Sequence, residues 1–218
     1  EGEQTPGVVF DIEDKVAIAC KLNEIGVQRL EAGFPAASQG EKKTVKAIVR
    51  ENLEAEIFGF ARAVKSDIDA VVESGCFGVM LSFPTSDIHL KYKLGISREE
   101  YLKRAVECVE YAKDHGLYVT YSAEDSTRTD MDFLLKVFKT VIDCGVNCPR
   151  IVDTLGIAMP KLMSKYVSAV KELTSLPIEV HCHNDHGMAV ANSIAGFEAG
   201  ASVISVSYTH LRAHETVL

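Results

Sequence analysis

The chain alternates between short β-branched runs and longer amphipathic segments, and this alternation restricts its fold more than any other feature. Seven runs predict strands, at residues 27–34, 55–60, 78–83, 117–122, 150–152, 178–181 and 201–206. Segments with apolar residues at helical spacing predict helices at residues 12–26, 42–49, 68–74, 98–115, 131–145, 160–173 and 190–199. Strict alternation with short loops indicates parallel βαβ units.

Seven such units predict an α/β fold, a (β/α)8 TIM barrel that is truncated because its first strand and last helix are missing. Residues 1–206 would form this partial catalytic domain, as an open barrel with a gap where the first strand belongs. A doubly wound sheet is the rival fold. It is disfavoured because no Gly-x-Gly-x-x-Gly motif follows any of the predicted strands.

Composition excludes several classes of function. The chain has 218 residues, a net charge of -8 and no basic block, so nucleic acid is not an expected partner. No apolar run approaches the roughly 20 residues of a membrane span, so a membrane is not expected either. Six cysteines are too few for a disulfide framework. They are expected to be reduced thiols in a cytoplasmic protein.

Two histidines at the end of one predicted strand suggest a metal site. His181 and His183 are two residues apart, so their side chains leave the strand on the same face. Two imidazoles on one face can act as a pair of metal ligands, and Asn184 and Asp185 could accept hydrogen bonds from them. The alternative is a pair of hydrogen-bonded histidines that bind no metal.

Polar residues gather where the predicted strands end. They are Glu31, residues 84–87, residues 124–126, Asp153, Thr154 and the two histidines. In a TIM barrel the carboxyl ends of the strands form the catalytic face, so we expect these side chains to share it. The loop at residues 1–7 would follow the missing first strand and would lie on the same face.

The segments at these strand ends resemble those of the pyruvate-carboxyltransferase-like metalloenzymes. This family includes 2-isopropylmalate synthase, homocitrate synthase, citramalate synthase and, more distantly, hydroxymethylglutaryl-CoA lyase. The resemblance covers about residues 1–206. It rests on Glu1-Gly2-Glu3-Gln4-Thr5-Pro6-Gly7, Glu31-Ala32-Gly33-Phe34-Pro35, Thr85-Ser86-Asp87-Ile88-His89, Glu124-Asp125, Asp153-Thr154-Leu155-Gly156 and His181-Cys182-His183-Asn184-Asp185-His186-Gly187.

The resemblance implies a role for each matching residue. Glu1, His181 and His183 would bind a divalent metal ion, which could be Zn, Mn or Mg. Gln4, Ser122 and Thr154 would contact the substrate, with Thr154 at the carboxylate of a 2-oxo acid, and Glu124 would handle a proton in catalysis. The alternative for Glu124 is a salt-bridged or helix-terminal carboxylate. The arginine that the family places before Glu1 is absent from the sequence.

The implied activity is the metal-assisted condensation of acetyl-CoA with a 2-oxo acid. The motifs look closest to 2-isopropylmalate synthase, an enzyme of leucine biosynthesis, with homocitrate synthase or citramalate synthase as alternatives. The full-length protein is expected to be a homodimer. A second alternative is a non-catalytic barrel whose histidine pair holds a structural ion or none. Cys144, Cys148 and Cys182 could also suggest a thiolate zinc site, although their spacing is a weak signal.

The C-terminal tail departs from the family pattern. The family continues its last strand into Asn-Gly-x-Gly-Glu-Arg-x-Gly-Asn, whereas this chain ends in residues 207–218 with no strand or glycine signal. The tail looks like translated sequencing-adapter read-through and is interpreted as non-native, so His210 and His214 receive no role. We expect the 218-residue chain itself to be inactive.

Overall fold

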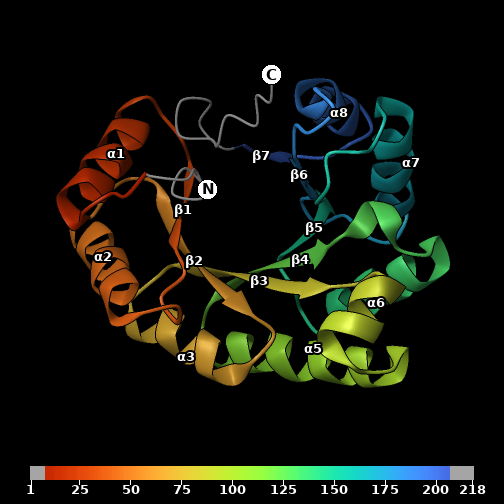
Figure 1. Cartoon of the computed structure of the whole chain (residues 1–218), viewed down its shortest axis with the longest axis horizontal. Coiled ribbons are helices and arrows are strands. Elements are labelled where there is room, and N and C mark those ends of the chain that lie inside the picture. Colours follow the sequence, from red (N-terminus) through yellow and green to blue (C-terminus); the bar gives the residue numbers. More distant parts are fainter. Residues whose placement is uncertain (1–7, 207–218) are drawn as a thin grey trace.

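The computed structural model describes residues 8–206 and shows seven parallel strands in one curled sheet. The strands pair in chain order, from β1 to β7, and the sheet opens between these two (Figure 1). Their bounds are β1 (Arg29–Gly33), β2 (Glu56–Arg62), β3 (Gly78–Pro84), β4 (Tyr118–Glu124), β5 (Cys148–Asp153), β6 (Glu179–Cys182) and β7 (Val203–Ser205). The predicted open barrel is therefore confirmed for the described residues.

The longer helices lie outside the curled sheet (Figure 1). Their bounds are α1 (Ile12–Glu24), α2 (Gln39–Arg50), α3 (Lys65–Glu73), α5 (Arg98–Asp114), α6 (Met131–Asp143), α7 (Pro160–Lys171) and α8 (Ala189–Glu198). Between β3 and α5 lie the short α4 (Asp87–His89) and a π-helical turn, Leu90–Leu94. A 3₁₀ turn, Ser126–Arg128, follows β4.

Side-chain caps explain where several helices begin. Asp11 and Asp14 form a reciprocal capping box at the start of α1. Ser97 accepts a hydrogen bond from the amide of Glu100 at the start of α5, and Asp130 accepts one from the amide of Phe133 at the start of α6. Serine and aspartate are favoured at this position because their side-chain oxygens accept hydrogen bonds from the unpaired amides of the first turn. The short helical turns after β3 and β4 were not expected, because runs of three to five residues carry no readable period.

The two faces of the sheet differ in character. Alternate residues such as Val79, Leu81, Val119 and Ile151 are fully buried between the strands and the outer helices. Because successive side chains point to opposite faces, the residues between them line the inside of the curl. This inner face includes the polar residues Ser82, Ser122, Arg150, Glu179 and His181, beside apolar residues such as Met80 and Val152. The side chains of the outer face thus form the apolar core, and the inner face carries the polar side chains that could bind a metal ion or a ligand.

Several sequence predictions fall beyond these residues or concern the whole chain. Glu1, Gln4 and the tail at residues 207–218 lie outside the described part of the chain, so the non-native tail remains a prediction. Within residues 8–206, no helix is long and apolar enough to cross a membrane. All six cysteines are free, as expected.

Asp125 forms hydrogen bonds that connect three of the loops that follow the strands. Its side chain is fully buried, and its backbone φ of 66° lies in the left-handed region that aspartate tolerates better than most residues. The carboxylate accepts hydrogen bonds from Ser86 after β3 and from Arg128 after β4. Its own amide donates to the hydroxyl oxygen of Thr154 after β5, at 2.7 Å. One residue therefore sets the relative positions of these loops.

We expect the substitution Asp125→Asn to lower the free energy of unfolding by about 1–3 kcal/mol, because Ser86 and Arg128 lose a buried charged acceptor. The matched control is Asp143→Asn, since Asp143 pairs with Lys139 on an exposed helix surface. The control should change stability by less than about 0.5 kcal/mol. Urea-induced unfolding measures both, and equal effects of the two substitutions would contradict the structural role of Asp125.

Candidate active site

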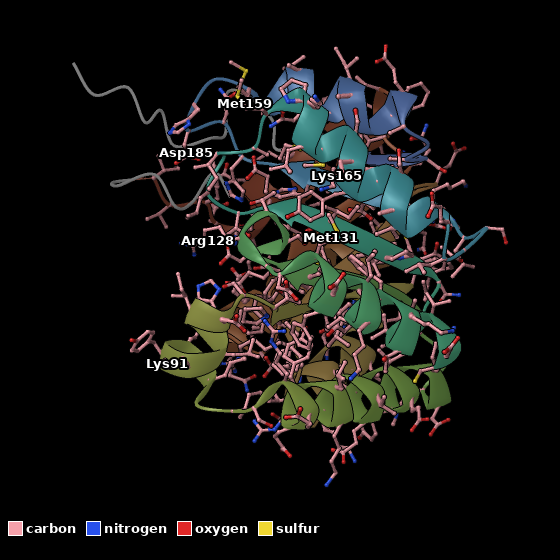
Figure 2. All side chains as sticks on the ribbon, turned by 90° about the vertical axis from the view of Figure 1, so that its right-hand side faces the viewer. Lys91, Arg128, Met131, Met159, Lys165 and Asp185 are labelled. Atoms are coloured by element: carbon pink, nitrogen blue, oxygen red, sulfur yellow. The ribbon has the colours of Figure 1, made fainter. Side chains whose placement is uncertain are left out.

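The loops that follow the strands meet at one end of the curled sheet, which we call the mouth. Figure 2 labels Lys91, Arg128 and Asp185, which come from the segments after β3, β4 and β6, and all three lie along the same side of the molecule. This arrangement follows from the parallel sheet, in which every strand runs toward the same end. The mouth is where the sequence predicted the polar residues to gather.

His181 and His183 lie together at the mouth. The centres of their rings are 5.0 Å apart, and the ring planes meet at 78°. His181 ends the inner row of β6 and is 8% exposed. The amide of His183 donates to the carbonyl oxygen of Asp153, so the ladder with β5 continues one step beyond the strand. The two imidazoles therefore share one face of the sheet.

The hydrogen bonds around the histidine pair include one that the sequence did not indicate. Asn184 accepts a hydrogen bond from the amide of Ala189 and so helps to begin α8. His181 contacts Ser205 on β7, whose hydroxyl oxygen lies 2.9 Å from Nδ1. Sequence reasoning missed this contact because the two residues meet only through the pairing of β6 with β7.

The described histidine pair offers two ligands for a metal ion. No group of three or more histidine, cysteine, aspartate or glutamate side chains within residues 8–206 could hold one. The third predicted ligand, Glu1, lies outside the described residues. Two imidazoles that share a face fit a divalent ion that is completed by a carboxylate, since such a donor set leaves coordination positions open.

The inner row of β4 brings Ser122 and Glu124 to the same region. Ser122 is 4% exposed and lies in register between Ser82 on β3 and Arg150 on β5. Glu124 ends the strand, and its Oε1 accepts a hydrogen bond from Lys93 Nζ at 2.8 Å. Lys93 belongs to the π-helical turn and is half exposed, so this ion pair contributes little to stability. The contact agrees with the salt-bridged alternative for Glu124 and leaves its role in catalysis a prediction.

Thr154 is oriented by the Asp125 loop. Its hydroxyl oxygen accepts the amide hydrogen of Asp125, which leaves the hydroxyl hydrogen able to donate to a bound anion. The neighbouring Asp153 is fully buried and accepts hydrogen bonds from the amides of Ile157 and Ala158. These contacts hold the loop after β5 in place, and they give Asp153 a structural role that the sequence did not reveal.

Arg150 is the residue of this region that the sequence prediction missed. Its side chain is 3% exposed inside the curl, and Nη1 lies 2.6 Å from Glu31 Oε1 on β1. Nη2 donates to Ser205 Oγ at 2.7 Å, and Nε lies 3.2 Å from Glu179 Oε1. Burial raises the pKa of Glu179, and the charge of Arg150 opposes that shift. The signal in the sequence was an arginine within an otherwise apolar strand.

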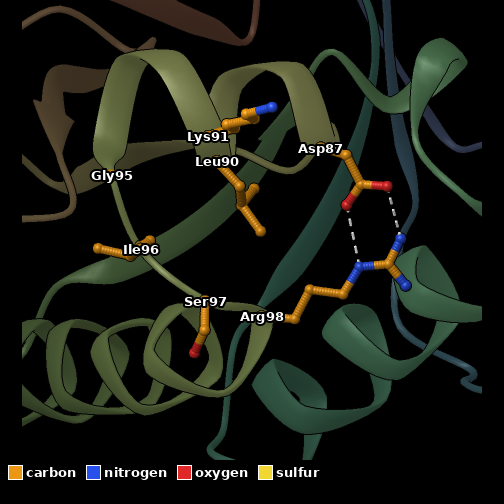
Figure 3. A pocket seen from close by; sticks show the side chains of 7 residues that line it. All are labelled: Asp87, Leu90, Lys91, Gly95, Ile96, Ser97 and Arg98. Atoms are coloured by element: carbon orange, nitrogen blue, oxygen red, sulfur yellow. Dashed lines mark hydrogen bonds and ion pairs between the residues drawn. The ribbon is translucent and has the colours of Figure 1, made fainter.

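A surface pocket of about 540 Å³ lies beside the mouth, between the π-helical turn and α5 (Figure 3). Arg98 and Asp87 line it and form a two-point ion pair, with hydrogen bonds of 3.0 and 2.8 Å. Asp87 was predicted to share the catalytic face, but none of the predicted metal, substrate-binding or catalytic residues within residues 8–206 lines this pocket. It is therefore separate from the histidine pair.

The thiolate zinc alternative gains no support. Cys144, Cys148 and Cys182 do not form a metal-binding group with other residues in the described range. Burial raises the pKa of Cys148 to about 12 and that of Cys182 to about 11.

The comparisons with known proteins agree with this architecture. A "Probable 2-isopropylmalate synthase" of Methanopyrus kandleri is 53% identical over 207 residues, which cover 95% of this chain and 42% of that protein. A homocitrate synthase of the same organism is 50% identical over 95% of this chain and 52% of its own length. A putative (R)-citramalate synthase of Methanothermobacter thermautotrophicus is 48% identical over 94% of this chain and 41% of its own length. The chain thus spans about half, or less, of the length of these relatives.

Solved structures with low sequence identity share the fold. The HMG-CoA lyase of Bacillus subtilis has a TM-score of 0.81 at 19% identity, over 93% of this chain and 72% of that one. An HMG-CoA lyase described in complex with coenzyme A and 3-methylmalate has a TM-score of 0.80 at 20% identity, over 93% of this chain and 70% of its own. The predicted TIM-barrel fold class is thereby confirmed.

The family model described as HMGL-like matches residues 1–209, which is nearly the whole chain. Together with relatives of about 50% identity, this match establishes the family. The chain belongs to the HMGL-like family.

Proposed function

We propose that the intact protein is an acyltransferase that condenses acetyl-CoA with a 2-oxo acid. The observation that carries this proposal is the His181–His183 pair, with ring centres 5.0 Å apart at the mouth of the curled sheet. Ser122, Glu124 and Thr154 follow or end neighbouring strands at the same mouth. The relatives named as 2-isopropylmalate, homocitrate and citramalate synthases support the same class of reaction.

A divalent metal ion would be held by Glu1, His181 and His183. When bound, such an ion supplies Lewis-acid polarisation of the 2-oxo carbonyl group. The fit rests on the donor chemistry: two imidazoles on one face, completed by a carboxylate from the first loop. Zn, Mn and Mg all remain candidates.

The remaining residues of the site would bind substrate and move a proton. Thr154 would donate its hydroxyl hydrogen to the carboxylate of the 2-oxo acid, because its oxygen already accepts from Asp125. Gln4 and Ser122 would contact the same substrate. Glu124 would take a proton from the methyl group of acetyl-CoA, with the ammonium group of Lys93 beside it. The methyl carbon would then add to the carbonyl carbon of the 2-oxo acid, the π electrons of that carbonyl would move to its oxygen, and the oxygen would take up a proton. Water would hydrolyse the thioester and release coenzyme A.

We propose 2-isopropylmalate synthase activity, in leucine biosynthesis, as the specific function, with homocitrate and citramalate synthesis as alternatives. Relatives with all three names match at similar identity, and a binding pocket discriminates 2-oxo acids that differ by one methylene by only about 1–3 kcal/mol. The test is release of free thiol from acetyl-CoA by the full-length protein with 2-oxoisovalerate, 2-oxoglutarate or pyruvate. A preference for 2-oxoisovalerate supports the first assignment, whereas turnover with none of the three would overturn the proposed class. A homodimer in the cytoplasm remains our prediction.

In the full-length protein, His183→Ala should remove one metal ligand and weaken metal affinity by more than about 100-fold, because even outer-shell partners contribute 10- to 100-fold. Condensation should be lost together with the metal. The matched control is His115→Ala, since His115 ends α5 on the protein surface, away from the pair. Elemental analysis after dialysis measures occupancy, and full occupancy in the His183 variant would refute its assignment as a ligand.

The substitution Glu124→Gln should leave metal occupancy unchanged and reduce turnover by about 10²- to 10⁴-fold, because it removes a proton acceptor and keeps the shape of the side chain. Acetyl-CoA turnover and elemental analysis are measured on the same sample. The control Glu100→Gln removes an exposed carboxylate that pairs with Arg104 on α5. Turnover close to that of the unaltered enzyme would show that Glu124 does not handle the proton.

A further inference from the structure

A chain of hydrogen bonds joins His181 to a buried arginine on another strand. Ser205 Oγ lies 2.9 Å from Nδ1 of His181 and accepts a hydrogen bond from Arg150 Nη2 at 2.7 Å. Arg150 is held in turn by Glu31 Oε1, at 2.6 Å, and lies 3.2 Å from Glu179 Oε1. The contacts run across β5, β6 and β7 and reach β1, on the far side of the opening.

We propose that Ser205, anchored by Arg150, is a positioning residue that holds the ring of His181 so that Nε2 is its metal-binding nitrogen. The inference rests on the proposed function, because it needs His181 to be a ligand. An imidazole has two nitrogens, and a hydrogen bond to one of them determines which nitrogen faces the metal. Since Nδ1 faces Ser205, Nε2 is the nitrogen that the geometry presents to an ion.

A hydroxyl suits this position because it can both donate and accept. Arginine is always a donor, so Arg150 occupies one lone pair of Ser205 Oγ and fixes the position of that oxygen. In the metal-bound state His181 must carry its hydrogen on Nδ1, and Nδ1–H then donates to the second lone pair of the oxygen. Without metal, the serine hydrogen can instead donate to Nδ1. The same two side chains therefore hold the ring in one orientation in both states.

The side chain of Arg150 is largely shielded from water. It is 3% exposed and the side chain of Glu179 is 7% exposed, whereas that of Glu31 is 41% exposed. An ion pair from which water is excluded cannot exchange its partners as freely as the exposed pair between Lys93 and Glu124. Ser205 therefore receives its hydrogen bond from a donor whose position varies little.

The test compares Ser205→Ala with Ser205→Thr in the full-length protein. Ser205→Ala removes the hydroxyl and should raise the dissociation constant for Zn²⁺ by about 10- to 100-fold, measured by competition with a chromophoric chelator. Ser205→Thr keeps the hydroxyl and should restore affinity to within a few fold. Because Ser205→Ala also leaves Arg150 Nη2 without this acceptor, the unfolding midpoint of each metal-free variant is measured as well. Zinc is then titrated under conditions in which both metal-free variants are folded, which separates positioning from a general loss of structure.

Nitrogen-15 NMR of the histidines in the Zn²⁺-loaded protein provides a second measurement. The unaltered protein should show His181 with hydrogen on Nδ1 and slow exchange of that hydrogen with water, whereas Ser205→Ala should show fast exchange. Unchanged zinc affinity and unchanged exchange in Ser205→Ala, beside a clear loss of affinity in His183→Ala, would overturn this inference alone. Failure of the unaltered protein to bind any of Zn²⁺, Mn²⁺ and Mg²⁺ would overturn the proposed function as well.

Discussion

The period-two alternation of side chains along parallel strands is the constraint on which the rest of this structure depends. In a curled sheet covered by helices, one set of residues enters the apolar core and the other set lines the inside of the curl. Val79, Leu81 and Val119 belong to the first set, and Ser122, Arg150 and His181 belong to the second. Without that separation, the outer core would bury unpaired polar groups, and the inside would offer no ligands to a substrate.

Several charged side chains of the inner face are shielded from water, so each of them needs a partner of opposite charge or a hydrogen bond. A buried charge is tolerated only when other groups compensate it. Arg150 meets this condition through Glu31, Glu179 and Ser205, which come from three different strands. Lys93 and Glu124 meet at the mouth with more solvent around them.

Buried hydrogen bonds also fix the loops that follow the strands. Asp125 and Asp153 are both fully buried, and each uses its carboxylate to satisfy donors from more than one segment. Thr154 lies between them and takes its orientation from the amide of Asp125. The orientation of the Thr154 hydroxyl therefore depends on a neighbouring loop whose position is set by the buried carboxylate of Asp125.

The sequence by itself determined the seven βα units, the caps at Asp11, Ser97 and Asp130, and the shared face of His181 and His183. These features depend on periodicity and on contacts within a few residues, which a single sequence displays directly. Only the tertiary structure decided that His181 meets Ser205, that Lys93 reaches Glu124 and that Arg150 pairs with Glu31. Those partners are 24, 31 and 119 residues apart in the chain. Their meeting depends on strand register and on the curl of the sheet, which local patterns do not encode.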